Sequence, residues 1–167
     1  MLPIPYAYLE VIPAGKNLFS ALYQFENGLR LAIHEQMSLF YDDWWESKVK
    51  FDLPRIYEKV EDRKQQRDLM PWVGSSSRVS VLPIHLTTLG EVEEIVKKYQ
   101  SECIPELFRS LHFFLGHMEY IKLVRNLYAH MFPCLTDSDA RSAKSEIRTL
   151  CQSLREKLPS LLSMQTP

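Results

Sequence analysis

Apolar residues recur at steps of three and four positions along most of this chain, a spacing typical of one face of an α-helix. A first long helix is expected from Asn17. Its apolar positions are Leu18, Leu22, Phe25, Leu29, Ile33, Met37 and Phe40. A last helix is expected after Thr136, which together with Asp139 is typical of a helix start. Its apolar positions are Ala140, Ala143, Ile147, Leu150, Leu154 and Leu161.

Capping signals mark two further helix starts in the middle of the chain. Asp43 with Glu46 predicts a capping box after a turn, and Thr88 with Glu91 predicts another. Each pair combines an N-cap side chain with an acidic residue that can bind back to the N-cap backbone. Between them, residues 70–85 hold glycine, serines and prolines, so we expect a loop there.

Prolines complete this division of the chain. Pro54 suits the first turn of a helix, so a break is expected just before it. Pro105 is likewise expected to begin a helix, which would run to about Phe132. Prolines near the N-terminus predict an extended arm over residues 1–16, followed by a single domain over residues 17–165. These elements predict an all-α protein, an up-and-down bundle of four long helices plus short helices.

Composition places the chain among ordinary globular proteins, with 46% apolar and 25% charged residues. A net charge of −1 argues against an extended basic surface for nucleic acid, although a small site with local positive charge is still able to act on RNA. Three cysteines without a CxxC spacing, Cys103, Cys134 and Cys151, are expected to be reduced thiols. Without a signal peptide or an apolar run of membrane length, we expect a cytoplasmic protein with no membrane partner.

The candidate site lies in the stretch VRNLYAHMF, residues 124–132. At about 100° per residue, one polar stripe of the predicted helix runs into this stretch. The stripe consists of His112, Gly116, Glu119, Asn126 and His130. The amide of Asn126 is placed to hold the imidazole of His130 in one tautomer. A glycine in mid-helix costs roughly 1 kcal/mol against alanine, so Gly116 indicates close approach of another backbone, such as that of a partner subunit.

Arg125 lies beside this stripe, and its long side chain can bend toward the same anion. In RNA transesterification the 2′-OH loses a proton, the 5′-oxygen gains one, and the pentavalent phosphate needs positive charge. A histidine can move the protons, and an arginine offers a fixed cation whose fork fits phosphate oxygens. This chemistry needs no metal ion and no cofactor. Because it needs two proton transfers, a symmetric dimer would help by supplying second copies of His130 and Arg125.

The segment RNLYAH resembles the R-x4–6-H motif of the HEPN superfamily (higher eukaryotes and prokaryotes nucleotide-binding), including the polar residue after the arginine. Over residues 17–160, the long first helix, the YDDWW turn, the LTTLGEVEEIVKK segment, the motif helix and the last helix follow the layout of bacterial abortive-infection and toxin-type members. The resemblance implies an all-α homodimer whose motif helices face each other across a cleft.

For many members, the resemblance further implies a metal-independent ribonuclease that acts on RNA as a toxin or antiviral defence effector. Arg125 and His130 would then be the catalytic pair, with Asn126 in support. Some members pair with an antitoxin or another defence-system partner protein. Other members do not cleave RNA, so the alternative is a non-catalytic module for dimerisation, partner binding or nucleotide binding in a defence or regulatory system.

Three further residues in or near the motif are candidates for substrate binding. Lys122 would add local positive charge, and Tyr128 would stack on a base or else belong to the core. Glu119 would orient Arg125 or His130 across the dimer, or else be a solvated surface residue. The alternative for the catalytic pair itself is an arginine in a surface ion pair and a histidine at a helix end.

Other conspicuous side chains are interpreted as structural. Trp44, Trp45 and Trp72 are expected to pack in the core rather than to form a platform for bases. His112 and His117 are five positions apart, whereas two histidines that share a metal on a helix are normally four apart. We therefore expect these two histidines to be structural or surface residues.

Overall fold

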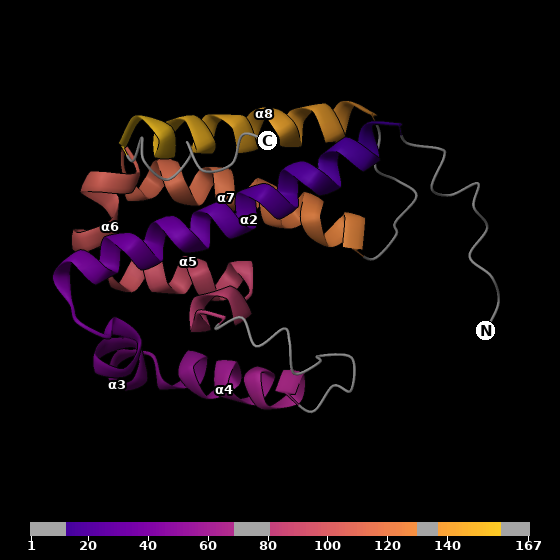
Figure 1. Cartoon of the computed structure of the whole chain (residues 1–167). Helices are drawn as coiled ribbons and strands as arrows, with labels where there is room; N and C mark the ends of the chain where they lie inside the picture. Colours follow the sequence, from indigo (N-terminus) through magenta and orange to yellow (C-terminus); the bar gives the residue numbers. More distant parts are fainter. Residues whose placement is uncertain (1–12, 69–80, 130–136, 158–167) are drawn as a thin grey trace.

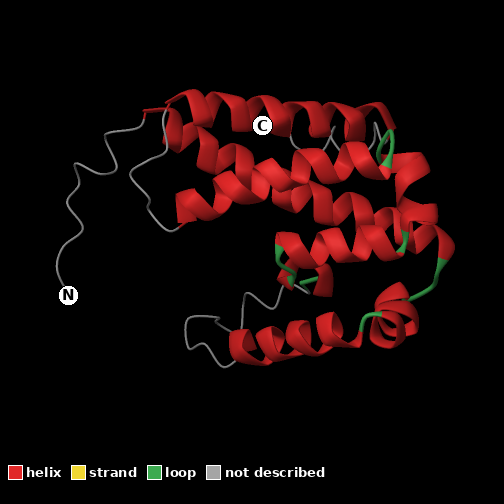
Figure 2. Ribbon diagram, turned by 180° about the vertical axis from the view of Figure 1, so that it is seen from behind, coloured by secondary structure: helices red, strands yellow, loops and turns green. Residues whose placement is uncertain are grey.

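The computed structural model describes residues 13–68, 81–129 and 137–157. Its helices are α2 (Pro13–Phe40), α3 (Lys50–Asp52), α4 (Pro54–Asp68), α5 (Leu89–Lys98), α6 (Gln100–Leu107), α7 (Leu111–Ala129) and α8 (Asp137–Lys157), with a π-helical turn η1 (Trp45–Val49) and a 3-10 turn η3 (Pro83–Leu86). No strand occurs within the described ranges (Figure 2). The predicted all-α class is therefore confirmed.

The central element of the fold is α2, which crosses the molecule from one end to the other (Figure 1). It contacts α8, α6, η3 and α5. The helix that carries the candidate motif, α7, packs against α8 and α5. At the opposite edge of the molecule from α8, α4 contacts η3, α3 and η1 (Figure 1). The motif helix is thus held by neighbours on two sides.

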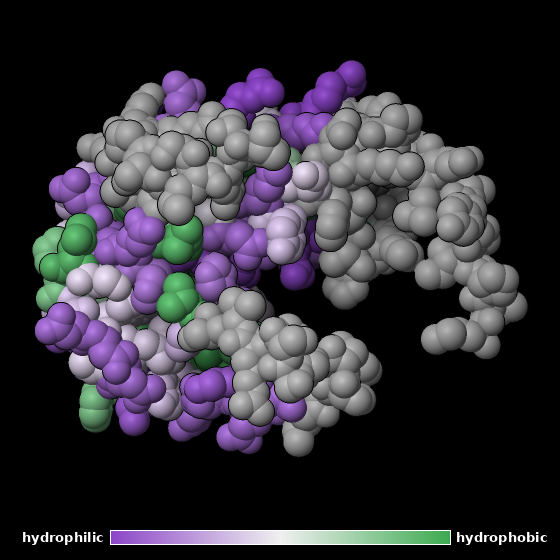
Figure 3. Space-filling model, in the orientation of Figure 1, coloured by the Kyte–Doolittle hydropathy of each residue, from purple (hydrophilic) through white to green (hydrophobic). Residues whose placement is uncertain are grey.

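The apolar seams predicted for the first and last helices form the core. Their buried members are Leu18, Leu22, Phe25, Leu29, Ile33 and Met37 in α2, and Ala140, Ala143, Ile147 and Leu150 in α8. Phe40 is an exception, since it is 54% exposed at the residue where α2 ends. The side chain of Leu154 and all of Leu161 lie outside the described part of the chain. On the face shown in Figure 3, hydrophilic residues cover most of the described surface, and apolar residues form isolated patches.

The first helix begins earlier than its apolar pattern predicts, at Pro13 rather than Asn17. Proline is favoured at the first position of a helix because the N–H that it lacks would have no partner in the helix. Residues 13–16 therefore belong to α2 and not to the predicted extended arm. The rest of that arm, residues 1–12, lies outside the described residues.

One of the two predicted capping boxes forms. At the start of α5, Oγ1 of Thr88 accepts from the backbone N–H of Glu91 at 3.3 Å, and the Glu91 carboxylate accepts from the N–H of Thr88 at 2.7 Å. The Asp43–Glu46 box is wrong, because η1 starts without a side-chain cap and Asp43 has a positive φ of 43°. The Glu46 carboxylate instead accepts from Lys50 at 3.0 Å and from the hydroxyl of Tyr57 at 2.9 Å.

The motif helix does not begin at Pro105, which is a second correction to the predicted boundaries. Pro105 lies inside α6, and α7 starts at Leu111 after a break at Phe108, whose backbone is extended. Phe108 is 1% exposed, and its ring lies 4.5 Å from that of Phe114. Burial of this aromatic pair explains the break, because an extended residue turns the chain so that both rings enter the core.

The predicted burial of two tryptophans is confirmed, since Trp44 is 2% exposed and Trp45 is 4% exposed. The third, Trp72, lies outside the described residues. The indole Nε1 of Trp44 donates to Nδ1 of His34 at 3.0 Å. This bond requires His34 to be unprotonated at Nδ1, and it ties the turn before η1 to the central helix.

Stability is expected to fall as the pH decreases below about 6.5, because burial lowers the pKa of His34 from this ordinary value. Below pH 6.5 the unfolded chain binds a proton at His34, whereas the folded chain binds it only at a lower pH. The stability that neutral His34 contributes is therefore complete above pH 6.5 and is lost as the pH falls through the lowered pKa. Melting temperatures between about pH 8 and pH 5 would measure the effect. His34→Asn keeps an acceptor for Trp44 without a titrating ring and should make the profile less steep, whereas His85, whose pKa burial also lowers, keeps its own part of the effect; an unchanged profile would contradict the assignment.

Candidate functional site

The polar stripe predicted for the motif helix faces solvent. His112, Gly116, Glu119 and Asn126 are all exposed on α7, and so is Leu123, at 55%. The opposite side of the helix belongs to the core, with Phe114, Met118, Ile121 and Val124 buried. A Cβ added at Gly116 would meet no atom within 4 Å. Within the described part of the chain no backbone approaches Gly116 closely, and the open surface there leaves room for another molecule.

Arg125 is a surface residue, with 45% of its side chain exposed in the last part of α7. Its Nε forms an ion pair with Oε1 of Glu26 at 3.5 Å, and its Nη1 donates to Oδ1 of Asn126 at 3.4 Å. The structure thus brings two of the three predicted catalytic residues together. The third, His130, lies outside the described residues, so the contact predicted between Asn126 and His130 stays a prediction.

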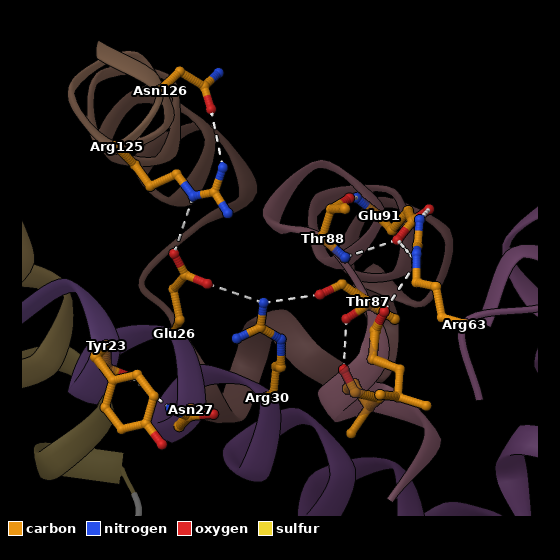
Figure 4. A network of polar contacts seen from close by, with 12 residues as sticks. Tyr23, Glu26, Asn27, Arg30, Arg63, Thr87, Thr88, Glu91, Arg125 and Asn126 are labelled. Carbon is orange, nitrogen blue, oxygen red and sulfur yellow. Dashed lines mark hydrogen bonds and ion pairs between the residues drawn. The ribbon is translucent and has the colours of Figure 1, made fainter. Parts of the chain in front are cut away.

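Glu26 on α2 connects Arg125 to a buried arginine, as Figure 4 shows. Its Oε2 accepts from Nη2 of Arg30 at 3.1 Å, and the same nitrogen donates to the carbonyl oxygen of Thr87 at 2.8 Å. Arg30 is only 6% exposed, and its Nε has no hydrogen-bond partner among the described residues. A buried guanidinium needs a negative partner, and Glu26 supplies it.

A second arginine–carboxylate pair fixes the turn that receives Arg30. Arg63 of α4 donates to both carboxylate oxygens of Glu91, at 2.7 and 2.8 Å, and to the carbonyl oxygen of Leu86 at 2.9 Å. Burial alone would raise the pKa of Glu91, but the hydrogen bonds from Arg63 and Thr88 outweigh it and hold that pKa below its ordinary value. Glu91 is therefore an anionic anchor for the residues around Thr87 (Figure 4).

The predicted substrate-binding residues have different surroundings. Lys122 forms an ion pair with Glu93, which also binds Lys97. Burial would raise the pKa of Glu93, but these two lysines lower it below its ordinary value, so the carboxylate offsets the charge expected from Lys122. Glu119 is exposed, and among the described residues it is Glu26 that pairs with Arg125. The side chain of Tyr128 lies outside the description.

Other titratable groups near α7 have structural partners. His117 pairs with Glu146 of α8, and the ring of Phe113 lies edge-on to its imidazole at 4.4 Å, so its predicted structural role is confirmed. Burial raises the pKa of Cys103 to about 12, which makes it a poor nucleophile. Cys134 lies outside the described residues. Within the ranges the structure describes, no three His, Cys, Asp or Glu side chains are grouped to hold a metal ion.

Sequence reasoning missed Glu26 and Arg30. The available signal was an acid and a base four residues apart beside the apolar seam of α2, where Arg30 directly follows the buried Leu29. Together Arg30, Glu26 and Arg125 carry two positive charges and one negative charge. Such a cluster can attract one phosphate, and the guanidinium of Arg125 is the exposed part that would touch it.

Comparisons of the chain with protein-family models, with curated proteins and with solved structures found no match. Among the described helices, none combines the length and the apolar character that crossing a bilayer requires.

Proposed function

We propose that this protein is a metal-independent endoribonuclease of the HEPN type, acting as a toxin or antiviral defence effector. The observation that supports this most is the exposed Arg125, whose Nε pairs with the carboxylate of Glu26 and whose Nη1 donates to Asn126. The two terminal nitrogens of an arginine form the fork that binds phosphate oxygens. An arginine held in this way is suited to a scissile phosphate.

The proposed reaction is attack of the ribose 2′-oxygen on the adjacent phosphorus. The 2′-OH gives up its proton, the new P–O bond closes a five-membered ring, and the P–O5′ bond breaks as the 5′-oxygen receives a proton. The products are a 2′,3′-cyclic phosphate and a 5′-OH end. His130 would transfer protons, Arg125 would bind the charge on the phosphorane oxygens, and Asn126 would orient the imidazole.

A two-fold dimer fits the exposed face of α7. Gly116, Glu119, Leu123 and Asn126 follow one another at steps of three and four, the spacing at which two helices meet along a seam. Gly116 would permit close approach of the second helix, and Leu123 would lose its contact with water. The dimer would then bring two copies of Arg125 and His130 to one cleft.

The test is incubation of the purified protein with total RNA and with tRNA in the presence of EDTA, followed by analysis of the product ends. We expect the wild type to leave 2′,3′-cyclic phosphates and His130→Ala to leave the RNA intact. Cleavage by His130→Ala at the wild-type rate would refute the role of His130. Cleavage that disappears with EDTA would refute the metal-independent mechanism.

The second candidate is a non-catalytic module for dimerisation or partner binding. It is favoured by the ion pairs that offset Arg125 and Lys122, because they reduce the charge available to RNA. If the protein is such a module, neither the wild type nor Leu123→Glu would cut RNA. Leu123→Glu would convert a dimer into a monomer or release a bound partner. Sedimentation of the wild type and this variant measures their oligomeric states, and a monomeric wild type would contradict the dimerisation role.

A further inference from the structure

Glu26 and its two arginine partners differ in their exposure to solvent. The side chain of Arg30 is 7% exposed, that of Glu26 is 16% exposed, and that of Arg125 is 45% exposed. The series therefore leads from the core to the surface. Because buried side chains have fewer accessible rotamers, the inner members are able to fix the position of the outer one.

The inner end of the series is attached to the backbone. Arg30 donates to the carbonyl oxygen of Thr87, which precedes the N-cap residue of α5. The capping box of Thr88 and Glu91 and the pair between Glu91 and Arg63 hold that turn. Arg30 is thereby placed by the central helix and by α4 and α5 together, so its Nη2 offers Glu26 a fixed donor.

The carboxylate of Glu26 is oriented by this donor. One of its oxygens, Oε2, faces Arg30, and the other, Oε1, faces Nε of Arg125 (Figure 4). A guanidinium presents two edges to an anion, one that includes Nε and one formed by the two terminal nitrogens. Glu26 lies at Nε, and Nη1 donates to Oδ1 of Asn126, so an incoming phosphate would take the remaining N–H groups of the two terminal nitrogens.

We propose that Glu26 is a positioning residue, which turns the terminal fork of Arg125 toward the scissile phosphate, and that Arg30 holds Glu26 for this purpose. The proposal rests on the proposed ribonuclease function, but the contact between Glu26 and Arg125 can be measured independently of cleavage. A different role for Glu26, as an anion that competes with phosphate for Arg125, makes the opposite prediction for its removal.

The experiment compares Glu26→Gln with wild type and with Glu35→Gln. Glutamine keeps the shape and an acceptor for Arg30 but removes the charge that holds Arg125. Glu35 is an exposed glutamate on the same helix, so its variant makes the same charge change elsewhere. We expect Glu26→Gln to lower kcat about 10- to 100-fold with little change in KM, and Glu35→Gln to match wild type. Wild-type kcat in Glu26→Gln, or a higher kcat, would overturn the proposal.

A second measurement separates this proposal from the proposed function. The Nε–H resonance of Arg125 is followed by NMR while inorganic phosphate is added to each protein. We expect Glu26→Gln to shift this resonance without phosphate and to weaken its response to phosphate, whereas Glu35→Gln changes neither. If the wild type does not cut RNA but these shifts occur, the ribonuclease function fails and the positioning role stands. Identical resonances in Glu26→Gln and wild type would refute the positioning role even if RNA is cut.

Discussion

Arg125→Ala is expected to lower the rate of RNA cleavage by about 100- to 1,000-fold, the usual loss when one donor to a developing oxyanion is removed. The charge on the phosphate oxygens grows as the phosphorane forms, so a cation at that point stabilises the transition state more than the bound substrate. The loss should therefore appear in kcat as well as in kcat/KM. Single-turnover cleavage with enzyme in excess measures the chemical step directly.

Two companion variants separate the fork of Arg125 from its charge. Arg125→Lys keeps a positive charge but has neither Nε nor two terminal nitrogens, so we expect it to retain only part of the rate. Arg55→Ala removes an exposed arginine from α4, across the molecule from α7, and should leave cleavage unchanged. Equal losses in Arg125→Ala and Arg55→Ala would mean that general attraction of RNA, and not a specific phosphate contact, explains the effect.

The long helices of this fold could be predicted because their apolar periodicity is strong. The seams of α2 and α8 were identified position by position and are buried, from Leu18 to Met37 and from Ala140 to Leu150. Phe40 continues the α2 pattern and is nevertheless exposed. Periodicity assigns a residue to a face of a helix, but it does not say how far the neighbouring helices extend along that face.

The two predicted capping boxes show why local signals fail in some places. Both have an N-cap side chain followed three residues later by glutamate, yet only Thr88 and Glu91 form the box. Glu91 is held next to Thr88 by Arg63, which comes from another helix. Glu46 instead accepts hydrogen bonds from Lys50 and Tyr57. The outcome depends on tertiary partners that the four-residue pattern does not contain.

Only the part of the candidate site that lies on a single helix, α7, could be predicted from the sequence. The rotation of α7 placed Asn126 on an exposed stripe and Arg125 beside it, and both are exposed. The ion-pair partner of Arg125, Glu26, comes from α2, and Glu26 is in turn held by Arg30, which binds the turn before α5; no spacing rule connects residues so far apart in the sequence. The start of α7 was also misplaced, because Pro105 is a local helix-start signal and burial of Phe108 determines where the helix breaks.

Trp44→Ala is expected to lower the free energy of unfolding by about 3–5 kcal/mol, the range for removal of a large buried aromatic side chain. Trp44 is 2% exposed and packs edge-on against Trp45, with ring centroids 5.4 Å apart. The change would leave a cavity between the central helix and η1 and would also remove the donor to Nδ1 of His34. Urea unfolding, followed by the circular dichroism of the helices, measures the loss.

The tandem tryptophans offer a matched pair of variants that isolates the indole hydrogen bond. Trp44→Phe removes a donor that His34 uses, whereas Trp45→Phe removes an Nε1 that is buried without a partner among the described residues. A buried donor without a partner costs about 1–3 kcal/mol, so its removal offsets part of the lost packing. We therefore expect Trp45→Phe to destabilise the protein less than Trp44→Phe. The reverse order would show that packing volume, and not the hydrogen bond to His34, determines what each indole contributes.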